Sequence, residues 1–286
     1  WCGAGDAGPS GRTAVHDSRV SEADCASFID KWLAAEPWHR LLLVFEQSTQ
    51  RDARRLLESV GYELRSAALD SSDPRVVATK LGWWADEWKW LAAGQPRHPL
   101  TLALRQIARS DVDAQAGNAW IAAAAALAES DSDADLAARR ARWQRYTQAQ
   151  TVACQVWLDS RHIDPQTHAD ALLVERALRL DLDLSRGRLP VPLNMLAEAG
   201  ATRSQLAAGE ATAQRALAAY MDALAAALDL NEPTMRQVSR YRRAQAALAR
   251  LRADQLRRDP ASRWTGVKPL SAWRSVLAVW RVSRAL

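Results

Sequence analysis

The chain has 286 residues, of which 48% are hydrophobic and 25% charged, a balance typical of a globular protein that can bury a sizeable core. This composition excludes collagen-like, mucin-like and wholly disordered proteins. The three cysteines, an odd number without a CxxC pair, exclude a disulfide framework and a zinc knuckle. The longest apolar run, 119–128, is half as long as a membrane span, and no signal-like segment precedes it, so we expect a cytoplasmic protein.

Charge is distributed unevenly along the sequence. The net charge is +5, but residues 235–286 contain 13 Lys and Arg against 2 Asp and Glu, so this segment carries +11 and the remainder −6. Such asymmetry indicates either an anionic partner or a solvated basic helix. Nucleic acid is not favoured as the partner, because the aromatic residues are mostly tryptophans at helical core spacing and form no basic stacking platform.

The predicted elements are helices from end to end. Residues 1–20 are rich in Gly, Asp and Ser and are interpreted as a disordered tail. In 21–286 apolar residues recur every three or four positions, which predicts one helical domain. The predicted helices span 21–35, 38–69, 75–93, 97–109, 115–128, 133–159, 165–184, 212–230, 233–258 and 268–284, with proline marking most of the breaks.

Three sequence patterns that resemble cofactor sites lack the context that the chemistry needs. A GxGxxG pattern at 3–8 has no strand before it, and the acidic run at 131–135 lacks the glycine and the final glutamate of a calcium loop. The five histidines show no HxxxH or HExxH spacing. The sequence therefore predicts no metal site of these types and no nucleotide cofactor.

Three segments, taken together, carry a resemblance. The first is KLGWWADEW at 80–88, with GQPRHP at 94–99. The second is RGRLPVP at 186–192, with LAEAG at 196–200, and the third is the basic segment 269–284. In order and spacing they resemble the squalene/phytoene synthase family over roughly residues 25–286. Taken singly, the tryptophans are explained by core packing and the arginines by a helix C-terminus.

The resemblance implies an all-α, single-domain bundle of the isoprenoid synthase type around a central apolar cavity. Members of this family join two prenyl diphosphates head to head and hold Mg²⁺ with two aspartate-rich motifs on facing helices. This sequence departs from both. Gly61, Tyr62 and Arg65 stand where the first motif has aspartates. In the second motif Asp183 matches one aspartate, but Arg179 replaces the other.

The remaining carboxylates nearby are weak catalytic candidates: Glu63, Glu175, Asp181 and Asp183. A fixed positive charge about 4 Å from a divalent ion costs roughly 8 kcal/mol at an effective dielectric of 20, so Arg65 and Arg179 argue against the usual Mg²⁺ cluster. Arg179 also has a structural explanation, as an i,i+4 partner of Glu175 and Asp183. The alternative is that cationic side chains bind an anionic head group directly. The candidate ligand-binding residues are Tyr62, Arg65, Arg179, Arg186 and Arg188.

The basic C-terminal segment offers a second surface. Leu270, Trp273, Val276, Leu277 and Trp280 share one helix face with arginines beside it. This pattern is typical of a segment, here 268–286, that docks on the anionic inner face of a membrane. It is equally typical of a helix that packs against the rest of its own bundle.

Two function hypotheses follow. The first is a squalene/phytoene synthase-like protein without the usual Mg²⁺-dependent catalysis, which binds an isoprenoid diphosphate or other lipid or serves as an assembly factor. The second is an active transferase that uses Mg²⁺ as cofactor through displaced ligands.

Overall fold

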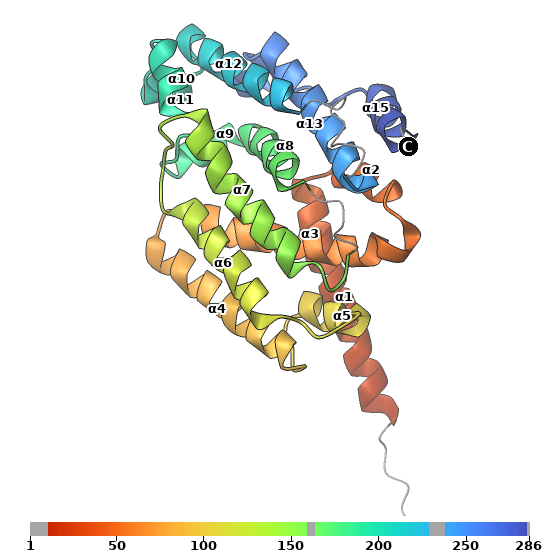
Figure 1. Ribbon diagram of the computed structural model, residues 1–286. Helices are drawn as coiled ribbons and strands as arrows, with labels where there is room; N and C mark the ends of the chain where they lie inside the picture. The colour runs from red at the N-terminus through yellow and green to blue at the C-terminus, as the bar shows by residue number, and fades with distance from the viewer. Residues whose placement is uncertain (1–10, 159–163, 229–237, 285–286) are drawn as a thin grey trace, which may run out of the picture.

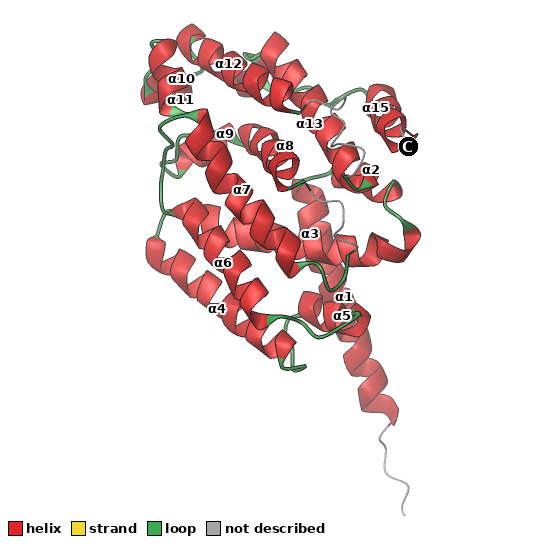
Figure 2. Cartoon of the chain, viewed as in Figure 1, coloured by secondary structure: helices red, strands yellow, loops and turns green. Residues whose placement is uncertain are grey.

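The computed structural model describes residues 11–158, 164–228 and 238–284, and every regular element in them is helical (Figure 2). The helices are, in chain order, α1 (Gly11–Ala35), α2 (His39–Val44), α3 (Ser48–Leu69), α4 (Pro74–Ala92), α5 (Pro99–Ile107), α6 (Ala114–Ala128), α7 (Leu136–Ala153), α8 (Pro165–Ala177), α9 (Leu180–Ser185), α10 (Leu193–Glu198), α11 (Arg203–Ala208), α12 (Ala211–Ala227), α13 (Arg240–Arg258), α14 (Ser262–Thr265) and α15 (Ala272–Arg284). The all-α fold class predicted from the sequence is confirmed.

Asp–Pro pairs begin helices where the sequence predicts breaks. Asp73 precedes α4 and Asp164 precedes α8, and each carboxylate accepts a backbone N–H of the first turn, at 2.8 Å and 3.0 Å respectively. Pro74 and Pro165 occupy the first helical position, where the missing N–H costs nothing. These local signals fix the starts of α4, on one flank of the bundle, and of α8, near its centre.

The prediction of one continuous helix over 38–69 is wrong, because the chain turns between α2 and α3. Arg51 stabilises this turn from the first turn of α3. Its Nε donates to the carbonyl of Leu43 at 2.9 Å and its Nη2 to that of Glu46 at 3.2 Å. Carbonyls at the end of α2 therefore find a donor, and no proline or glycine is needed to end the helix.

Other boundaries also differ from the prediction. The helix predicted over 165–184 is divided into α8 and α9 at Arg179, whose φ of −113° and ψ of 30° leave the helical region. At the N-terminal end α1 begins at Gly11, and the first half of the predicted tail, 1–10, lies outside the described residues. The predicted start of the helix over 233–258 also lies outside them, and α13 begins at Arg240.

The bundle is built outward from its central helices (Figure 1). α7 packs between α6 and α8, and α8 also packs against α13. On one flank α4 covers α6, and on the other α12 and α15 cover α13. The largest fully buried side chains include Trp32, Trp88, Trp120 and Trp157. Among the tryptophans of the first motif segment, Trp84 and Trp88 are buried as core packing predicts, whereas Trp83 is 42% exposed.

The C-terminal helix α15 contacts the bundle with small residues. Ser275 and Val279 are its buried residues, whereas Trp273 is 74% exposed and Trp280 is 44% exposed. Val276, between them, is 40% exposed. The face that carries the tryptophans therefore points away from the bundle in the described part of the chain.

Candidate functional site

The helices that carry the two motif positions line one small cavity. From α3 come Tyr62 and Arg65, from α8 comes Glu175, and Arg179 lies between α8 and α9. The guanidinium of Arg179 lies 5.7 Å from the centre of the Tyr62 ring. Three of the predicted ligand-binding residues are therefore brought together. The free volume among them is about 20 Å³, room for about one water molecule.

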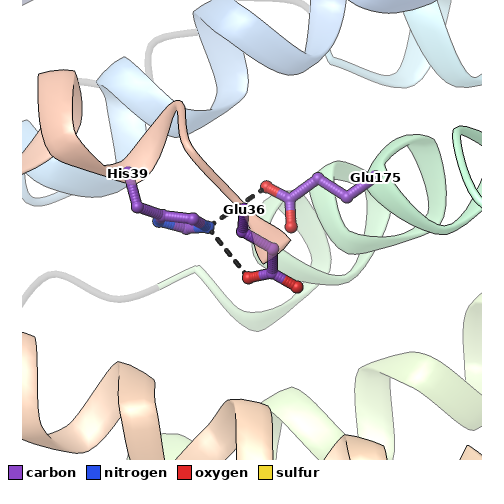
Figure 3. Close-up of side chains that lie close together, drawn as sticks. All are labelled: Glu36, His39 and Glu175. Carbon is purple, nitrogen blue, oxygen red and sulfur yellow. Dashed lines mark ion pairs between the residues drawn. The ribbon is translucent and has the colours of Figure 1, made fainter. Parts of the chain in front are cut away.

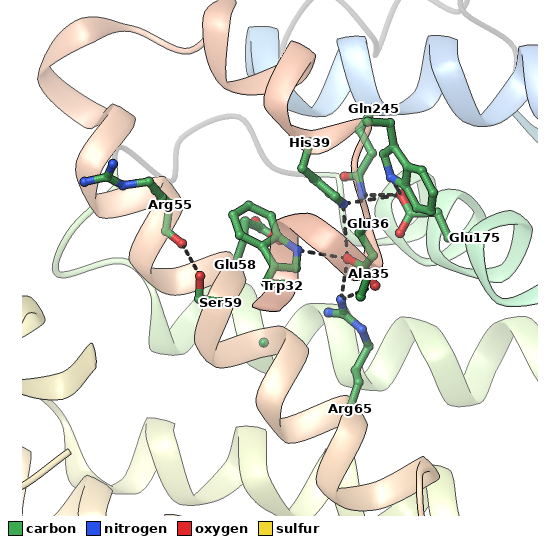
Figure 4. A network of polar contacts seen from close by, with 12 residues as sticks. Trp32, Ala35, Glu36, His39, Arg55, Glu58, Ser59, Arg65, Glu175 and Gln245 are labelled. Atoms are coloured by element: carbon green, nitrogen blue, oxygen red, sulfur yellow. Dashed lines mark hydrogen bonds and ion pairs between the residues drawn. The ribbon is translucent and has the colours of Figure 1, made fainter. Parts of the chain in front are cut away.

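Glu36, which follows α1, contacts both arginines, and Figure 4 shows it beside Arg65. Arg65 Nη2 lies 3.3 Å from both carboxylate oxygens, and Arg179 Nη2 lies 3.6 Å from Oε1. Trp32 Nε1 donates to Oε2 at 2.9 Å, and Arg179 also donates to the Ala35 carbonyl at 3.0 Å. Burial alone would raise the pKa of the Glu36 carboxyl, but Arg65, His39 and Arg179 lower it well below its ordinary value.

His39 joins Glu36 to a second buried carboxylate (Figure 3). Its Nε2 lies 3.3 Å from Glu36 Oε2 and 3.7 Å from Glu175 Oε1, while its Nδ1 lies 2.6 Å from the Tyr241 hydroxyl. Burial alone would lower the pKa of His39, but the hydrogen bonds and charges of Glu175 and Glu36 raise it to about 9. His39 is therefore a cation at neutral pH.

A further layer of buried ion pairs lies behind His39. Arg54 Nε lies 2.8 Å from Glu46, and Arg242 Nη2 lies 2.5 Å from Glu58. Arg54 Nη1 also lies 3.6 Å from Glu58, so the two pairs are linked. Gln245 on α13 donates to Glu175 at 3.1 Å and extends the network to that helix. Buried charges of this kind are tolerated only when each is paired.

Glu36, His39 and Glu175 have the donor set of a metal site but not its electrostatics. One ligand atom from each lies within 4.8 Å of the other two, which is close enough for one ion. However, Arg65 and Arg179 contact the Glu36 carboxylate, and each would repel a divalent ion by several kcal/mol. The Mg²⁺ that the resemblance implies also prefers oxygen ligands and retained waters to a buried imidazole. The residues present do not fit Mg²⁺.

The four carboxylates predicted as weak catalytic candidates do not converge. Glu63 pairs with Lys31 at 2.8 Å, and Glu175 accepts from Trp38 Nε1 at 3.1 Å as well as from Gln245. Asp181 is bound by Arg263, and Asp183 accepts from both Nε and Nη2 of Arg176. Each carboxylate is therefore bound by its own cation or hydrogen-bond donor, and the four do not surround one point where a metal ion could bind.

The other two predicted ligand-binding residues lie at a different cavity. Arg186 and Arg188 follow α9 and line a groove that runs along α4 and α6. Arg186 Nη1 pairs with Asp70 at 2.6 Å, and Arg188 is only 8% exposed. The predicted set is thus divided between the centre of the bundle and its flank.

Sequence reasoning missed the residues that organise the centre. Glu36 and His39 flank the short turn after α1, and Tyr241 and Gln245 come from α13, about 200 residues later. None belongs to a motif. Pro37, which follows Glu36, marks a helix end in the sequence, but it gives no indication that the carboxylate meets two arginines.

A known structure shares this architecture. Squalene synthase HpnC from Alicyclobacillus acidocaldarius superposes with a TM-score of 0.62 at 18% sequence identity, over 87% of this chain and 97% of that one. The chain has a squalene synthase fold. The isoprenoid synthase type of bundle predicted from the order of the motifs is therefore confirmed. No protein-family model and no curated protein sequence matches the chain.

Proposed function

We propose that this protein binds an isoprenoid diphosphate or another lipid without Mg²⁺-dependent ionisation, and that it has a lipid-binding or assembly role. The squalene synthase fold supports an isoprenoid or lipid ligand, since HpnC is named as a squalene synthase. Fold alone assigns no chemistry, so the proposal depends on the centre of the bundle.

One observation at the centre of the bundle supports the absence of Mg²⁺-dependent ionisation. The Arg65–Glu36–Arg179 bridge occupies the position between α3 and α8 where an acidic cluster would hold metal ions. Two guanidiniums there bind the Glu36 carboxylate, and the volume left, about 20 Å³, is too small for a diphosphate with hydrated ions. Ionisation of an allylic diphosphate needs its leaving group neutralised, and these residues offer no metal cluster for that purpose.

The alternative is an active head-to-head transferase with displaced ligands. It would use Glu63, Glu175, Asp181 and Asp183, each of which must first leave the cation or donor that now binds it. Asp183 is the most costly to release, because it is buried and Arg176 binds both of its oxygens.

Turnover assays separate the two hypotheses. The purified chain is incubated with farnesyl or geranylgeranyl diphosphate, with and without Mg²⁺, and released pyrophosphate and lipid products are measured. We expect no Mg²⁺-dependent release, while the diphosphates still raise the melting temperature. A squalene synthase assayed in parallel is the positive control. Mg²⁺-dependent release that is lost in Asp183→Ala would establish the transferase instead.

A membrane contact through α15 is a second element of the proposal. Trp273 and Trp280 are exposed on this helix, and Arg274, Arg281 and Arg284 beside them are also exposed. Tryptophans with arginines on one exposed helix suit the interface of an anionic bilayer. No described helix combines the length and the apolar character that crossing a bilayer requires.

Vesicle sedimentation tests this contact. We expect binding to vesicles with 30% phosphatidylserine, roughly tenfold weaker binding in the double variant Trp273→Ser and Trp280→Ser, and weaker binding at high salt. Trp83→Ser is the matched control, because Trp83 is 42% exposed but lies on α4. Equal loss in the control, or no binding by the wild type, would contradict the membrane contact.

A further inference from the structure

A large cavity lies on the flank of the bundle rather than between the motif helices. It has a volume of about 880 Å³ and runs along α4 and α6 to the segment after α9. This volume is within the range of about 300–1,000 Å³ that is typical of sites for small organic ligands.

Small side chains keep this groove open. Its floor consists of buried branched residues, and its walls of glycine and alanine. The floor residues are Val77, Leu81 and Ile121, and the wall residues include Ala78, Gly82, Ala85, Ala122 and Ala125. A Cβ added at Gly82 would meet no atom within 4 Å, so the space beside α4 is free. Most of the lining along both helices is apolar. The polar lining residues are Asn118 near the start of α6 and a cluster at the opposite end of the groove that includes Ser71, Asp131 and Arg188.

That polar end contains a buried arginine that lacks good acceptors. Arg188 Nη2 lies 3.5 Å from the carbonyls of Ala68 and Ser71, and Nη1 lies 3.9 Å from Asp131, which is beyond hydrogen-bond distance. Nε and Nη1 are buried without any hydrogen-bond acceptor. Burial lowers the pKa of Arg188, whereas the neighbouring Arg186 is paired with Asp70. A buried guanidinium with orphaned N–H groups is unusual and costly.

We propose that the α4/α6 groove binds the chain of a single-chain amphiphile and that Arg188 binds its anionic head group. The proposal deepens the lipid-binding function and depends on it. Carboxylates at the rim do not fill this role: the Asp131 side chain is 71% exposed and Glu129 is exposed, so both remain hydrated. An anionic oxygen that enters from the groove would supply the acceptor that Arg188 lacks, while the chain covers the apolar floor.

Calorimetric titration with defined probes tests the groove. The probes are farnesyl phosphate, palmitate, uncharged farnesol and inorganic phosphate. We expect farnesyl phosphate to bind the wild type at least about tenfold more tightly than farnesol or inorganic phosphate. Palmitate that binds as tightly indicates a general site for anionic amphiphiles, and palmitate that binds weakly indicates a phosphate site.

Matched substitutions locate the site. Gly82→Leu fills the groove, and Ala119→Leu adds a similar side chain to an exposed position of α6 outside it. We expect Gly82→Leu to weaken farnesyl phosphate binding at least about tenfold and Ala119→Leu to change it less than about twofold. Arg188→Gln should remove the preference for farnesyl phosphate over farnesol, and Arg188→Lys should restore part of it.

The outcomes also separate this inference from the proposed function. If Gly82→Leu binds farnesyl phosphate as tightly as the wild type, lipid binding stands and the groove is refuted as the site. If the preference for the charged probe survives Arg188→Gln, the head-group role is refuted. If no probe binds the wild type, both the groove and the lipid-binding function fail. Pyrophosphate release in the turnover assay would refute the proposed function alone.

Discussion

The centre of the bundle is filled by side chains, whereas its flank is left open. Between α3 and α8 long charged side chains reach inward and pair, which leaves about 20 Å³ free. Between α4 and α6 glycine and alanine leave about 880 Å³. A squalene synthase fold can therefore keep its helices while the open volume lies away from the motif positions. In this bundle the side chains, and not the fold, decide where free volume remains.

The largest effect is expected at the carboxylate that neutralises the centre. Glu36→Gln leaves the buried Arg65 and the partly buried Arg179 beside a neutral amide, and breaking the buried Arg65–Glu36 pair in this way costs about 3–5 kcal/mol. Urea denaturation measures the change in the free energy of unfolding. Glu63→Gln is the control, because its partner Lys31 is half exposed and the pair contributes under about 1 kcal/mol. Equal losses would mean that the centre is not held by its charges.

The charge on His39 makes the stability of the centre depend on pH. Its pKa is about 9 in the folded protein against an ordinary 6.5, so the stabilisation is fully present below about 6.5 and is lost as the pH rises through 9. The difference corresponds to a loss on the order of 3 kcal/mol. Urea denaturation from pH 6 to pH 10 measures it, and His39→Gln serves as the reference for other groups that titrate. Parallel curves for the two proteins would contradict the ion pairs.

A glycine on α6 tests how tightly the interior is filled. A Cβ added at Gly117 would lie 1.8 Å from Trp88 Nε1, inside the indole of a fully buried tryptophan. Gly117→Ala should therefore destabilise the protein by about 1–3 kcal/mol or more, despite the higher helix propensity of alanine. Thermal unfolding followed by circular dichroism measures the loss. An unchanged melting temperature would show that Trp88 has room to move.

The matched glycine on α4 should respond in the opposite direction. Gly82 lies in the groove with no atom near its missing Cβ, so Gly82→Ala gains helix propensity without a clash. We expect about 0.5–1 kcal/mol of stabilisation in the same unfolding experiment. Destabilisation would mean that the groove is closed in solution, which would weaken the contrast between the two regions.

The sequence predicts the helices and the type of bundle better than the side-chain contacts inside it. Proline and aspartate pairs place the starts of α4 and α8 correctly, and the order of the motifs predicts the bundle type. The pattern also places Tyr62, Arg65 and Arg179 around one point, as found. Spacing along helices carries this information because each signal is local.

The side-chain contacts at the centre of the bundle could not be predicted from local sequence patterns. Glu36 meets its arginines across 29 and 143 residues of sequence, and His39 meets Tyr241 across 202. No periodicity connects such distant positions. The break at Arg179 likewise has no proline or glycine beside it; there the Arg179 guanidinium donates to the Ala35 carbonyl at the end of α1. Arg186 and Arg188, three and five residues beyond Asp183, line the groove on the flank, which no local pattern indicates.

The most direct test is a crystal structure of the protein grown with Mg²⁺ and a non-hydrolysable farnesyl thiodiphosphate. We predict that Arg65, Glu36 and Arg179 remain bridged and that no metal density lies between α3 and α8. Two or three metal ions bound there by Glu175, Asp183 or neighbouring carboxylates would contradict the proposal and establish the protein as a metal-dependent transferase.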